Sequence, residues 1–322
     1  MTRLVIIGAG AVGGVVGARL AEAGVDVTLV ARGAHAAAME HDGLILAEPT
    51  RTVRIPVPVV RTVAAARIDA FTVVALAVKS QDIGAVLGEL QDCAPPQTPI
   101  ACFQNGVINE RVLGADFPRT YGVVVMMPAA HLEPGRVEAY ASPIPGLFDV
   151  GLASGAVDDV ARDLAGTLCL GGFDARAVPD VMRWKYTKLL MNLGNAVQAM
   201  CVLDDAAIEL VGRARDEGLA CLRAAGIDFA SSVEEQERRG DRLQVGTING
   251  TDRAGGSSWQ SMARGLGSIE SDALNGEIVR IGATVGVPAP VNALLLRRAL
   301  QAAADRLPPA SISAADLLAE LA

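Results

Sequence analysis

Near its amino terminus the chain reads Leu4-Val5-Ile6-Ile7-Gly8-Ala9-Gly10-Ala11-Val12-Gly13-Gly14. An apolar run of strand length turns here through spaced glycines into a helical pattern. Gly8 allows a tight turn, Gly10 lets the backbone approach a pyrophosphate, and Gly13 permits close packing of the helix against the strand. The phosphates would then meet the exposed N–H groups at the positive end of the helix. The stretch predicts a dinucleotide site formed by Gly8, Ala9, Gly10, Ala11, Val12 and Gly13.

The end of the second strand bears on which dinucleotide binds. The first helix ends at Gly24, and the strand from Val25 to Val30 follows directly. An enzyme that prefers NAD usually carries an acid after this strand, where it holds the ribose 2′-hydroxyl. Asp26 lies at the wrong end of the strand, whereas Arg32 can offer a planar guanidinium to a 2′-phosphate. The sequence therefore favours NADPH/NADP, with a merely solvated Arg32 as the alternative.

Length and composition restrict the class of protein. A chain of 322 residues predicts two domains. No apolar run approaches the roughly 20 residues of a membrane helix, and Met1 leads into the first strand without a signal peptide, so we expect a cytoplasmic protein with no membrane partner. A net charge of −8 without a basic cluster argues against nucleic acid as a partner.

The cysteines and histidines do not form the patterns of a disulfide framework or a metal site. Five cysteines are scattered without paired spacing, at positions 93, 102, 169, 201 and 221. The histidines, at positions 35, 41 and 131, have no ligand partner at helical spacing. We therefore expect reduced thiols in the core and no metal in the mechanism.

Strands and helices alternate only in the first part of the chain. The clearest further strands are predicted over residues 71–78, 99–103, 121–127 and 173–178. This alternation predicts a mostly parallel sheet with both faces covered. From Val181 the pattern is helical, with breaks near Gly226, over 246–256, at 265–267 and at 286–288. The fold class is α/β, with a Rossmann-type doubly wound domain over residues 1–178 and an all-α domain over 179–322.

Polar groups interrupt an apolar run near the start of the second domain, which reads Trp184-Lys185-Tyr186-Thr187-Lys188-Leu189-Leu190-Met191-Asn192-Leu193-Gly194-Asn195. At about 100° per residue, Asn192 lies about 40° from Lys188, and Asn195 lies about 20° to its other side. An ammonium flanked by amides on one helical face suits an anionic carbonyl substrate. A surface lysine with two solvated amides is the alternative, and Lys185 is a competing candidate one turn earlier.

Two further places carry polar residues. Asn105 and Gly106 follow a buried strand, where ligands of open α/β sheets bind, although Asn-Gly is often only a turn. Ser258 is followed twelve residues later by Glu270. Ser258 could equally be a helix N-cap, and Glu270 a surface acid in the first turn of a long helix.

Together these features resemble ketopantoate reductases (2-dehydropantoate 2-reductases). The order and approximate spacing of that family are found in the glycine-rich turn, Arg32, Val78-Lys79-Ser80-Gln81, Asn105-Gly106, Lys188 with Asn192, Ser257-Ser258, and Glu270 followed by Asn275-Gly276. The resemblance spans nearly the whole chain. It implies NADPH-dependent reduction of a 2-oxo acid in a cleft between the two domains, with ketopantoate as the first candidate. It also leaves a homodimer possible, formed through the helical domain.

The resemblance also implies residue roles. It makes Lys188 the general acid, places Asn192, Asn195 and Ser258 at the substrate, and puts Asn105 near both substrate and nicotinamide. Arg32 and Lys79 would serve the cofactor, and Glu270 would act in catalysis at the nicotinamide ribose end. The chemistry agrees, because hydride addition to a ketone leaves an alkoxide that a protonated lysine can stabilise and protonate.

Departures from the family pattern leave the substrate open. After Ser258 the family commonly continues Met-x-x-Asp, whereas Trp259 and Met262 stand here, and Asn195 falls seven residues after the lysine instead of eight. A different 2-oxo acid is therefore an alternative. A non-catalytic NADP-binding sensor is another, since fold alone does not fix function, although it would not need the lysine. An opine-dehydrogenase-like reaction would normally use a histidine, and residues 179–322 contain none.

Overall fold

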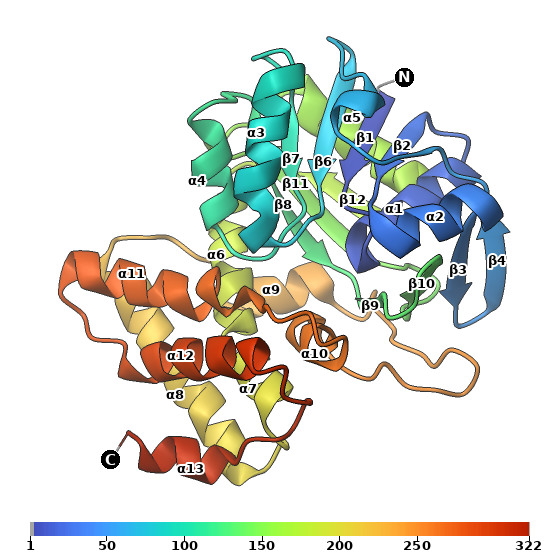
Figure 1. Cartoon of the computed structure of the whole chain (residues 1–322). Coiled ribbons are helices and arrows are strands. Elements are labelled where there is room, and N and C mark those ends of the chain that lie inside the picture. Colours follow the sequence, from blue (N-terminus) through green and yellow to red (C-terminus); the bar gives the residue numbers. More distant parts are fainter. Residues whose placement is uncertain (1–2, 322) are drawn as a thin grey trace. The chain divides into compact units, whose positions relative to one another are not determined.

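The computed structural model describes residues 3–321 of the chain (Figure 1). Packing divides these residues into two units. The first unit holds the residues up to 104, then 109–182 and 232–253. The second holds 105–108, 183–231 and the residues from 254 onward. No helix of the described part of the chain is long and apolar enough to cross a membrane.

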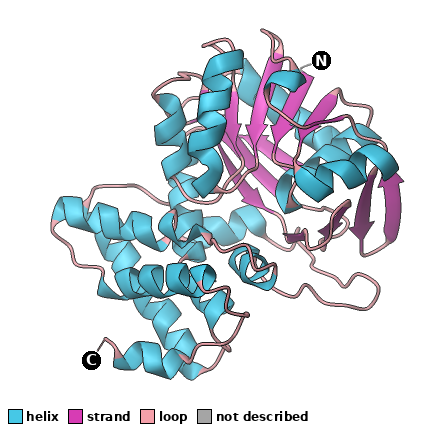
Figure 2. Cartoon of the chain, viewed as in Figure 1, coloured by secondary structure: helices cyan, strands magenta, loops and turns pink. Residues whose placement is uncertain are grey.

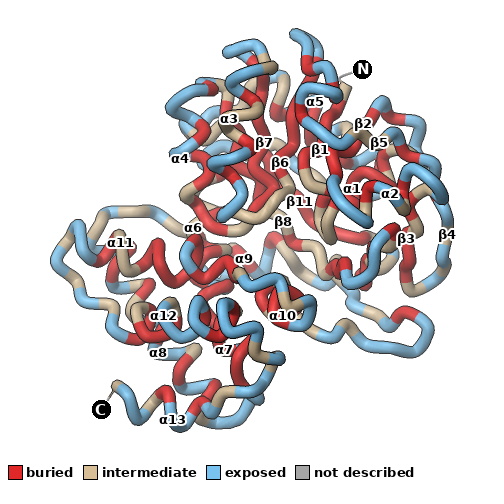
Figure 3. Tube along the Cα trace, in the orientation of Figure 1, coloured by how far each residue is buried: buried red, intermediate tan, exposed pale blue. Residues whose placement is uncertain are grey.

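The first unit is built on an eight-stranded sheet in the order β12-β11-β8-β7-β6-β1-β2-β5. Neighbouring strands are parallel except for the pair of β8 and β11. The strands span β1 Arg3–Ile7, β2 Val27–Val30, β5 Val59–Val60, β6 Thr72–Leu76, β7 Ile100–Cys102, β8 Thr120–Met126, β11 Leu147–Leu152 and β12 Asp174–Ala177. Strands β1, β6 and β7 are buried along nearly their whole length (Figure 3), which explains their continuous apolar sequences.

Helices cover both faces of this sheet (Figure 2). Side chains of α1 and α5 pack into one hydrophobic cluster, whereas side chains of α3 and α4 pack into another. The helices of the unit span α1 Ala11–Glu22, α2 Gly33–Asp42, α3 Ile83–Cys93, α4 Ile108–Gly114, α5 Asp159–Leu170 and α9 Ser232–Arg239. The predicted Rossmann-type, doubly wound architecture is confirmed.

A second, four-stranded sheet was not predicted. Its order is β4-β3-β10-β9, and its strands span β3 Leu44–Glu48, β4 Arg51–Ile55, β9 Ala129–Ala130 and β10 Arg136–Ala139. This sheet packs against α1, where a Cβ added at Gly14 would lie 2.7 Å from a methyl group of Val137. Its strands are short and form two antiparallel pairs, β3 with β4 and β9 with β10. These pairs come from segments far apart in sequence and are joined by β3 and β10, so no local pattern marked the sheet.

The second unit is helical, as predicted. Its elements are α6 Val181–Asn192, α7 Asn195–Met200, α8 Asp205–Ala224, α10 Ser257–Ala263, a 3₁₀ turn η3 Glu270–Asp272, α11 Asn275–Val285, α12 Pro290–Ala304 and α13 Ala314–Ala319. Gly218 in α8 lets α6 approach closely, because a Cβ there would meet Leu190 and Leu193 within 2.8 Å. Breaks fall near Gly226, Gly265 and Gly286, where the sequence predicts them.

Residues 232–253 pack with the first unit. The sequence pattern instead predicts a single domain boundary at residue 178, with these residues in the second domain. Arg238 of α9 donates from Nε to Oδ1 of Asp149 in β11 over 2.7 Å, and both side chains are buried. Arg238 also lies 3.6 Å from the carboxylate of Asp174 in β12. Burial raises the pKa of Asp149 despite the opposing effect of this arginine. The buried ion pair explains the departure, since it needs residues about 90 positions apart.

Candidate functional site

The glycine-rich turn has the geometry that a dinucleotide site needs. Gly8 has φ +101°, and a Cβ there would lie 2.7 Å from the backbone nitrogen of Val78. A Cβ at Gly13 would lie 2.0 Å from the carbonyl oxygen of Gly8. Among residues 3–321, no atom outside the chain neighbours of Gly10 lies within 4 Å of a Cβ built there. Gly10 is the N-cap of α1, and the first turn of this helix contains no acid. The positive end of α1 therefore opens onto free space at Gly10.

Arg32 and Lys79 lie at the same edge of the sheet as this turn. Arg32 is the N-cap of α2 after β2, and Lys79 precedes the 3₁₀ turn after β6. Strands β6, β1 and β2 are parallel neighbours, so the segments that follow them leave the sheet at one edge. The Arg32 side chain is 60% exposed and forms an ion pair with Glu89 of α3. A 2′-phosphate would have to compete with this carboxylate.

Asn105 and Asn192 come together although they are 87 positions apart. Asn192 is buried at the end of α6, and its Nδ2 donates to Oδ1 of Asn105 over 3.1 Å. Gly106, with φ +81°, brings the Asn105 loop against the end of the 3₁₀ turn η3, because a Cβ there would lie 2.8 Å from the carbonyl oxygen of Ala273. The structure thus forms an amide pair in the second unit from two predicted site residues.

The prediction of one helical face through residues 188, 192 and 195 is wrong in part. Lys188 and Asn192 share α6 four positions apart, but α6 ends at Asn192 and Asn195 begins α7. Gly194 lies in the break and packs closely against α8, because a Cβ at this glycine would lie 3.0 Å from a methyl group of Val211. Asn195 is therefore placed by α7 and not by the periodicity of α6.

The two candidate lysines differ in accessibility. Lys185 is buried, with 3% of its surface exposed, whereas Lys188 is half-buried. A proton donor must be reached by its substrate, which favours Lys188. The choice between the two stays a prediction.

Ser258 and Glu270 are both buried. Gly256 is the N-cap of α10, so Ser258 lies inside the helix and is not its cap. The Ser258 Oγ is inaccessible to solvent and has no hydrogen-bond partner among residues 3–321. Glu270 belongs to the 3₁₀ turn before α11, not to the first turn of that helix. A buried hydroxyl without a partner is costly unless a ligand satisfies it.

A buried polar network holds the connection between α6 and α7. Asn275 Nδ2 donates to the carbonyl oxygen of Leu193 and to Oδ1 of Asn292, each over 3.0 Å. Asn292 Nδ2 donates over 2.9 Å to Glu217, whose carboxylate also accepts from the backbone nitrogens at the start of α12. In the sequence, Asn275 stands out only as part of the family resemblance. Glu217 carried no signal, since it lies on a helix rich in charged residues.

The structure also bears on the Cys201 thiol and on candidate metal ligands among the described residues. Burial raises the pKa of the Cys201 thiol to about 11, so this group is protonated at neutral pH. Among residues 3–321, no group of three or more His, Cys, Asp or Glu side chains is arranged to hold a metal ion.

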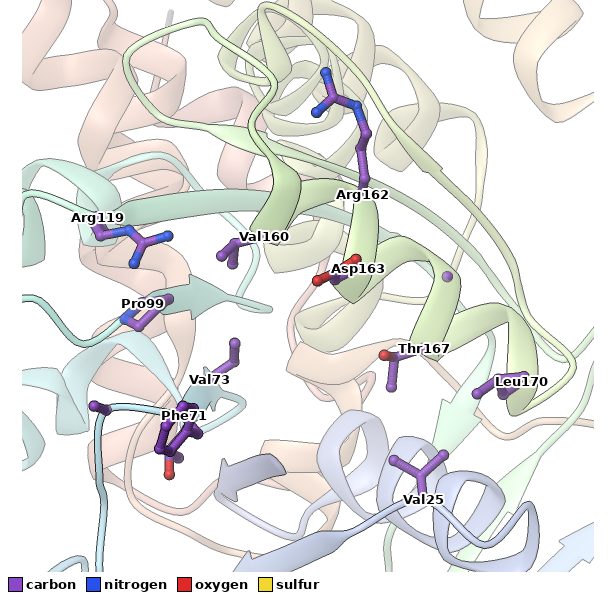
Figure 4. Close-up of a pocket in the computed structure, with 13 residues that line it drawn as sticks. Val25, Phe71, Val73, Pro99, Arg119, Val160, Arg162, Asp163, Thr167 and Leu170 are labelled. Atoms are coloured by element: carbon purple, nitrogen blue, oxygen red, sulfur yellow. The ribbon is translucent and has the colours of Figure 1, made fainter. Parts of the chain in front are cut away.

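A cavity of about 660 Å³ lies at the opposite edge of the large sheet (Figure 4). Its lining includes Phe71, Pro99 and Arg119 at the starts of strands and Asp163 and Thr167 on α5. Arg119 faces Asp158 at 3.7 Å. None of the predicted site residues lines this cavity, and ligands of open α/β sheets bind at the carboxyl ends of strands.

Comparison with protein families identifies relatives over both units. The family model described as ketopantoate reductase PanE/ApbA matches residues 4–152, and the model of its C-terminal part matches residues 180–302. The 2-dehydropantoate 2-reductase of Pyrococcus horikoshii is 27% identical over 301 residues, covering 91% of this chain and 95% of that protein. The enzyme of the same name from Caulobacter vibrioides is 29% identical over 310 residues, covering 92% and 97%.

Solved structures show the same architecture. The ketopantoate reductase family protein from Ralstonia eutropha is similar with a TM-score of 0.78 and 26% identity, covering 94% of this chain and 99% of that one. A D-mandelate dehydrogenase solved with NADH and anilino(oxo)acetate has a TM-score of 0.77 at 21% identity, covering 94% and 98%. At that identity the second likeness concerns the fold alone.

Proposed function

The chain belongs to the ketopantoate reductase family, and on this premise we propose that it reduces a 2-oxo acid to a 2-hydroxy acid with NADPH, with 2-dehydropantoate as the first candidate substrate. The observation that carries the proposal is the amide pair of Asn105 and Asn192. This hydrogen bond links the turn after β7 to α6, the helix that carries Lys188. A substrate site formed by residues of both segments needs them to lie close together.

The first unit supplies the groups for the nucleotide. The backbone of residues 8–13 and the start of α1 suit a pyrophosphate, and the open space at Gly10 leaves room for it. Arg32 suits a 2′-phosphate because a guanidinium can bind phosphate through two parallel hydrogen bonds. No acid stands at this position, which favours NADPH over NADH.

The second unit supplies the groups for the substrate. A bound nicotinamide would deliver a hydride to the ketone carbon. Lys188 would stabilise the developing alkoxide with its ammonium group and donate a proton from Nζ. The amides of Asn105 and Asn192 would orient the substrate, and the buried Ser258 hydroxyl would gain a partner. Glu270 and Asn195 lie close in sequence to these groups and are proposed to contribute to the same site.

A different 2-oxo acid is a second candidate substrate. Trp259 stands where the family commonly has methionine, and its ring folds over Gly255, since a Cβ there would lie 2.4 Å from the indole Cγ. Among solved structures of similar fold, the D-mandelate dehydrogenase carries the name of an aryl 2-hydroxy acid. We therefore include phenylglyoxylate beside ketopantoate, 2-oxoisovalerate and pyruvate as test substrates.

The experiment measures NADPH oxidation with this panel, followed by kinetics of Lys188→Ala and Lys185→Ala. General acid catalysis contributes roughly 10²–10⁴-fold, so Lys188→Ala should lower kcat by about that factor. The Kd for NADPH, measured by fluorescence, should change little because the nucleotide groups lie in the first unit.

Near-normal turnover by Lys188→Ala with collapse in Lys185→Ala would move the acid to Lys185. Nucleotide binding without turnover on any 2-oxo acid would favour the sensor alternative. Light scattering on the same preparation tests the homodimer.

A further inference from the structure

The segment that leads from α9 to α10 is fixed on the first unit. Its backbone runs beside residues 140–142, where Ser142 N donates to Gln244 O over 3.0 Å and Gly246 N donates to Tyr140 O over 2.7 Å. Buried Ile248 then joins a small hydrophobic cluster with Tyr140. A tight hairpin follows, closed by two backbone hydrogen bonds of 3.0 Å between Ile248 and Thr251.

Arg253 follows this hairpin by two residues, and its Nε has no hydrogen-bond partner among residues 3–321. The residue is half-buried, and its Nε is inaccessible to solvent and makes no hydrogen bond. No residue in the range 3–321 forms an ion pair with its guanidinium. The acid nearest in sequence to its neighbour Tyr140 is Glu138, which is engaged by the Tyr140 hydroxyl at 2.8 Å and by Arg136 at 3.0 Å. Burial lowers the pKa of Arg253, as expected for a desolvated cation without a counter-ion.

Arg238, in the helix before this segment, gives a comparison, because it is an arginine whose charge is paired. Arg238 is buried and is matched by Asp149 at 2.7 Å and by Asp174 at 3.6 Å. Arg253 is half-buried and has no such match, so part of its desolvation cost stays uncompensated in the unliganded protein. An anion that binds Arg253 would remove this cost, so the residue is poised for an anionic ligand.

We propose that Arg253 binds the carboxylate of the 2-oxo acid, an inference that rests on the proposed function. A guanidinium matches a carboxylate through two parallel hydrogen bonds. Arg253 precedes Ser258 by five residues, and a chain of that length spans at most about 17 Å. Lys188 is needed at the ketone oxygen, so the carboxylate requires a cation of its own. The nucleotide phosphates already have the amides of residues 8–13, Arg32 and Lys79.

This assignment narrows the substrate class to 2-oxo acids with a free carboxylate. An ester or lactone of the same ketone keeps the reacting carbonyl but loses the charge that Arg253 recognises. The residue would therefore act on substrate binding more than on the chemical step.

The test compares Arg253→Met and Arg253→Lys with Arg242→Met as a matched control. Arg242 lies on the same segment but is paired with Asp174 at 3.4 Å. A charge-assisted hydrogen bond lost from substrate binding should raise KM for ketopantoate, or for the panel member turned over fastest, about 10- to 100-fold in Arg253→Met. Arg253→Lys should recover part of this loss. The Kd for NADPH should stay within about twofold, as a ligand contact confined to the substrate predicts.

Thermal unfolding separates this role from a structural one. Arg253→Met removes a half-buried charge that has no ion-pair partner, so its unfolding temperature should equal or exceed that of the unmodified protein. Arg242→Met loses a paired arginine and should unfold at a lower temperature with an unchanged KM. Unchanged KM in Arg253→Met, or a weaker Kd for NADPH in place of a raised KM, would overturn the proposal; the second result would assign Arg253 to a nucleotide phosphate.

Calorimetric titration of oxamate into the NADP⁺-loaded protein gives a readout that needs no turnover. Oxamate resembles a 2-oxo acid but accepts no hydride. Binding that depends on Arg253, in a protein that reduces none of the panel, would support the anion site and reject the proposed function. Turnover by the unmodified protein with oxamate binding unaffected by Arg253→Met would reject the anion site alone.

Discussion

The ion pair between Arg32 and Glu89 predicts that the protein restrains its own affinity for NADPH. Glu89→Gln removes the carboxylate that competes with a 2′-phosphate for the guanidinium. The glutamine keeps an oxygen that can accept the hydrogen bond from Val63 N, which Glu89 Oε2 now accepts over 3.3 Å. The substitution therefore tests charge with little change in shape.

The expected gain follows from the exposure of the pair. The side chains are 60% and 33% exposed, and exposed ion pairs are worth about 0.2–1 kcal/mol. Releasing Arg32 should then tighten NADPH binding by roughly 1.4- to 5-fold, at about 1.4 kcal/mol per tenfold change. NADH lacks the 2′-phosphate, so its Kd should not change. The gain should shrink at high salt because exposed charges are screened.

Fluorescence titration of both nucleotides at low and high salt measures the effect. Glu40→Gln is a matched control, because Glu40 forms a comparable exposed pair with Arg61 at 2.6 Å. Its nucleotide affinities should equal those of the unmodified protein. Weaker NADH binding in Glu89→Gln, without a gain for NADPH, would refute the reasoning and show that Glu89 holds ribose hydroxyls.

Three further substitutions test the frame around the proposed site. Asp149→Asn leaves the buried Arg238 without its main counter-charge and should lower the free energy of unfolding by about 3–5 kcal/mol, measured by urea denaturation. Gly13→Ala places a methyl group 2.0 Å from the Gly8 carbonyl oxygen. This substitution should lower the free energy of unfolding by about 1–3 kcal/mol and weaken NADPH binding. An unchanged Kd for NADPH would show that the turn does not hold the nucleotide. Asn275→Ala leaves a buried carbonyl of the α6–α7 connection without its donor, costing about 1–3 kcal/mol in the same denaturation assay, and stability equal to the unmodified protein would contradict the role of this network.

The sequence predicted those parts of the fold that are marked by a local pattern of residues. The strand, glycine turn and helix over residues 4–24 form a local pattern, and the buried strands 72–76 and 100–102 are continuous apolar runs. These features predicted the doubly wound sheet. The same reasoning made Asn105 a candidate site residue, because residues after the carboxyl ends of parallel strands gather at one edge.

Features that depend on distant partners escaped prediction. Periodicity alone assumed a continuous α6 and did not mark the break between Asn192 and Asn195, where Gly194 packs against another helix. Glu89 looked like an ordinary surface acid until the fold brought it to Arg32. Arg253 belongs to no sequence motif. It became a candidate only because the structure shows its Nε without a hydrogen-bond partner.

The docking of α9 on the first unit makes the chain indivisible at its apparent midpoint. A polypeptide cut after residue 182 would lack Arg238, leaving Asp149 as a buried carboxylate without its counter-charge. It would also lack Ile248, which completes a small cluster beside β10. Exchange of halves between relatives would therefore need residues 232–253 to travel with the amino-terminal part, so the protein is modular in space but not along its gene.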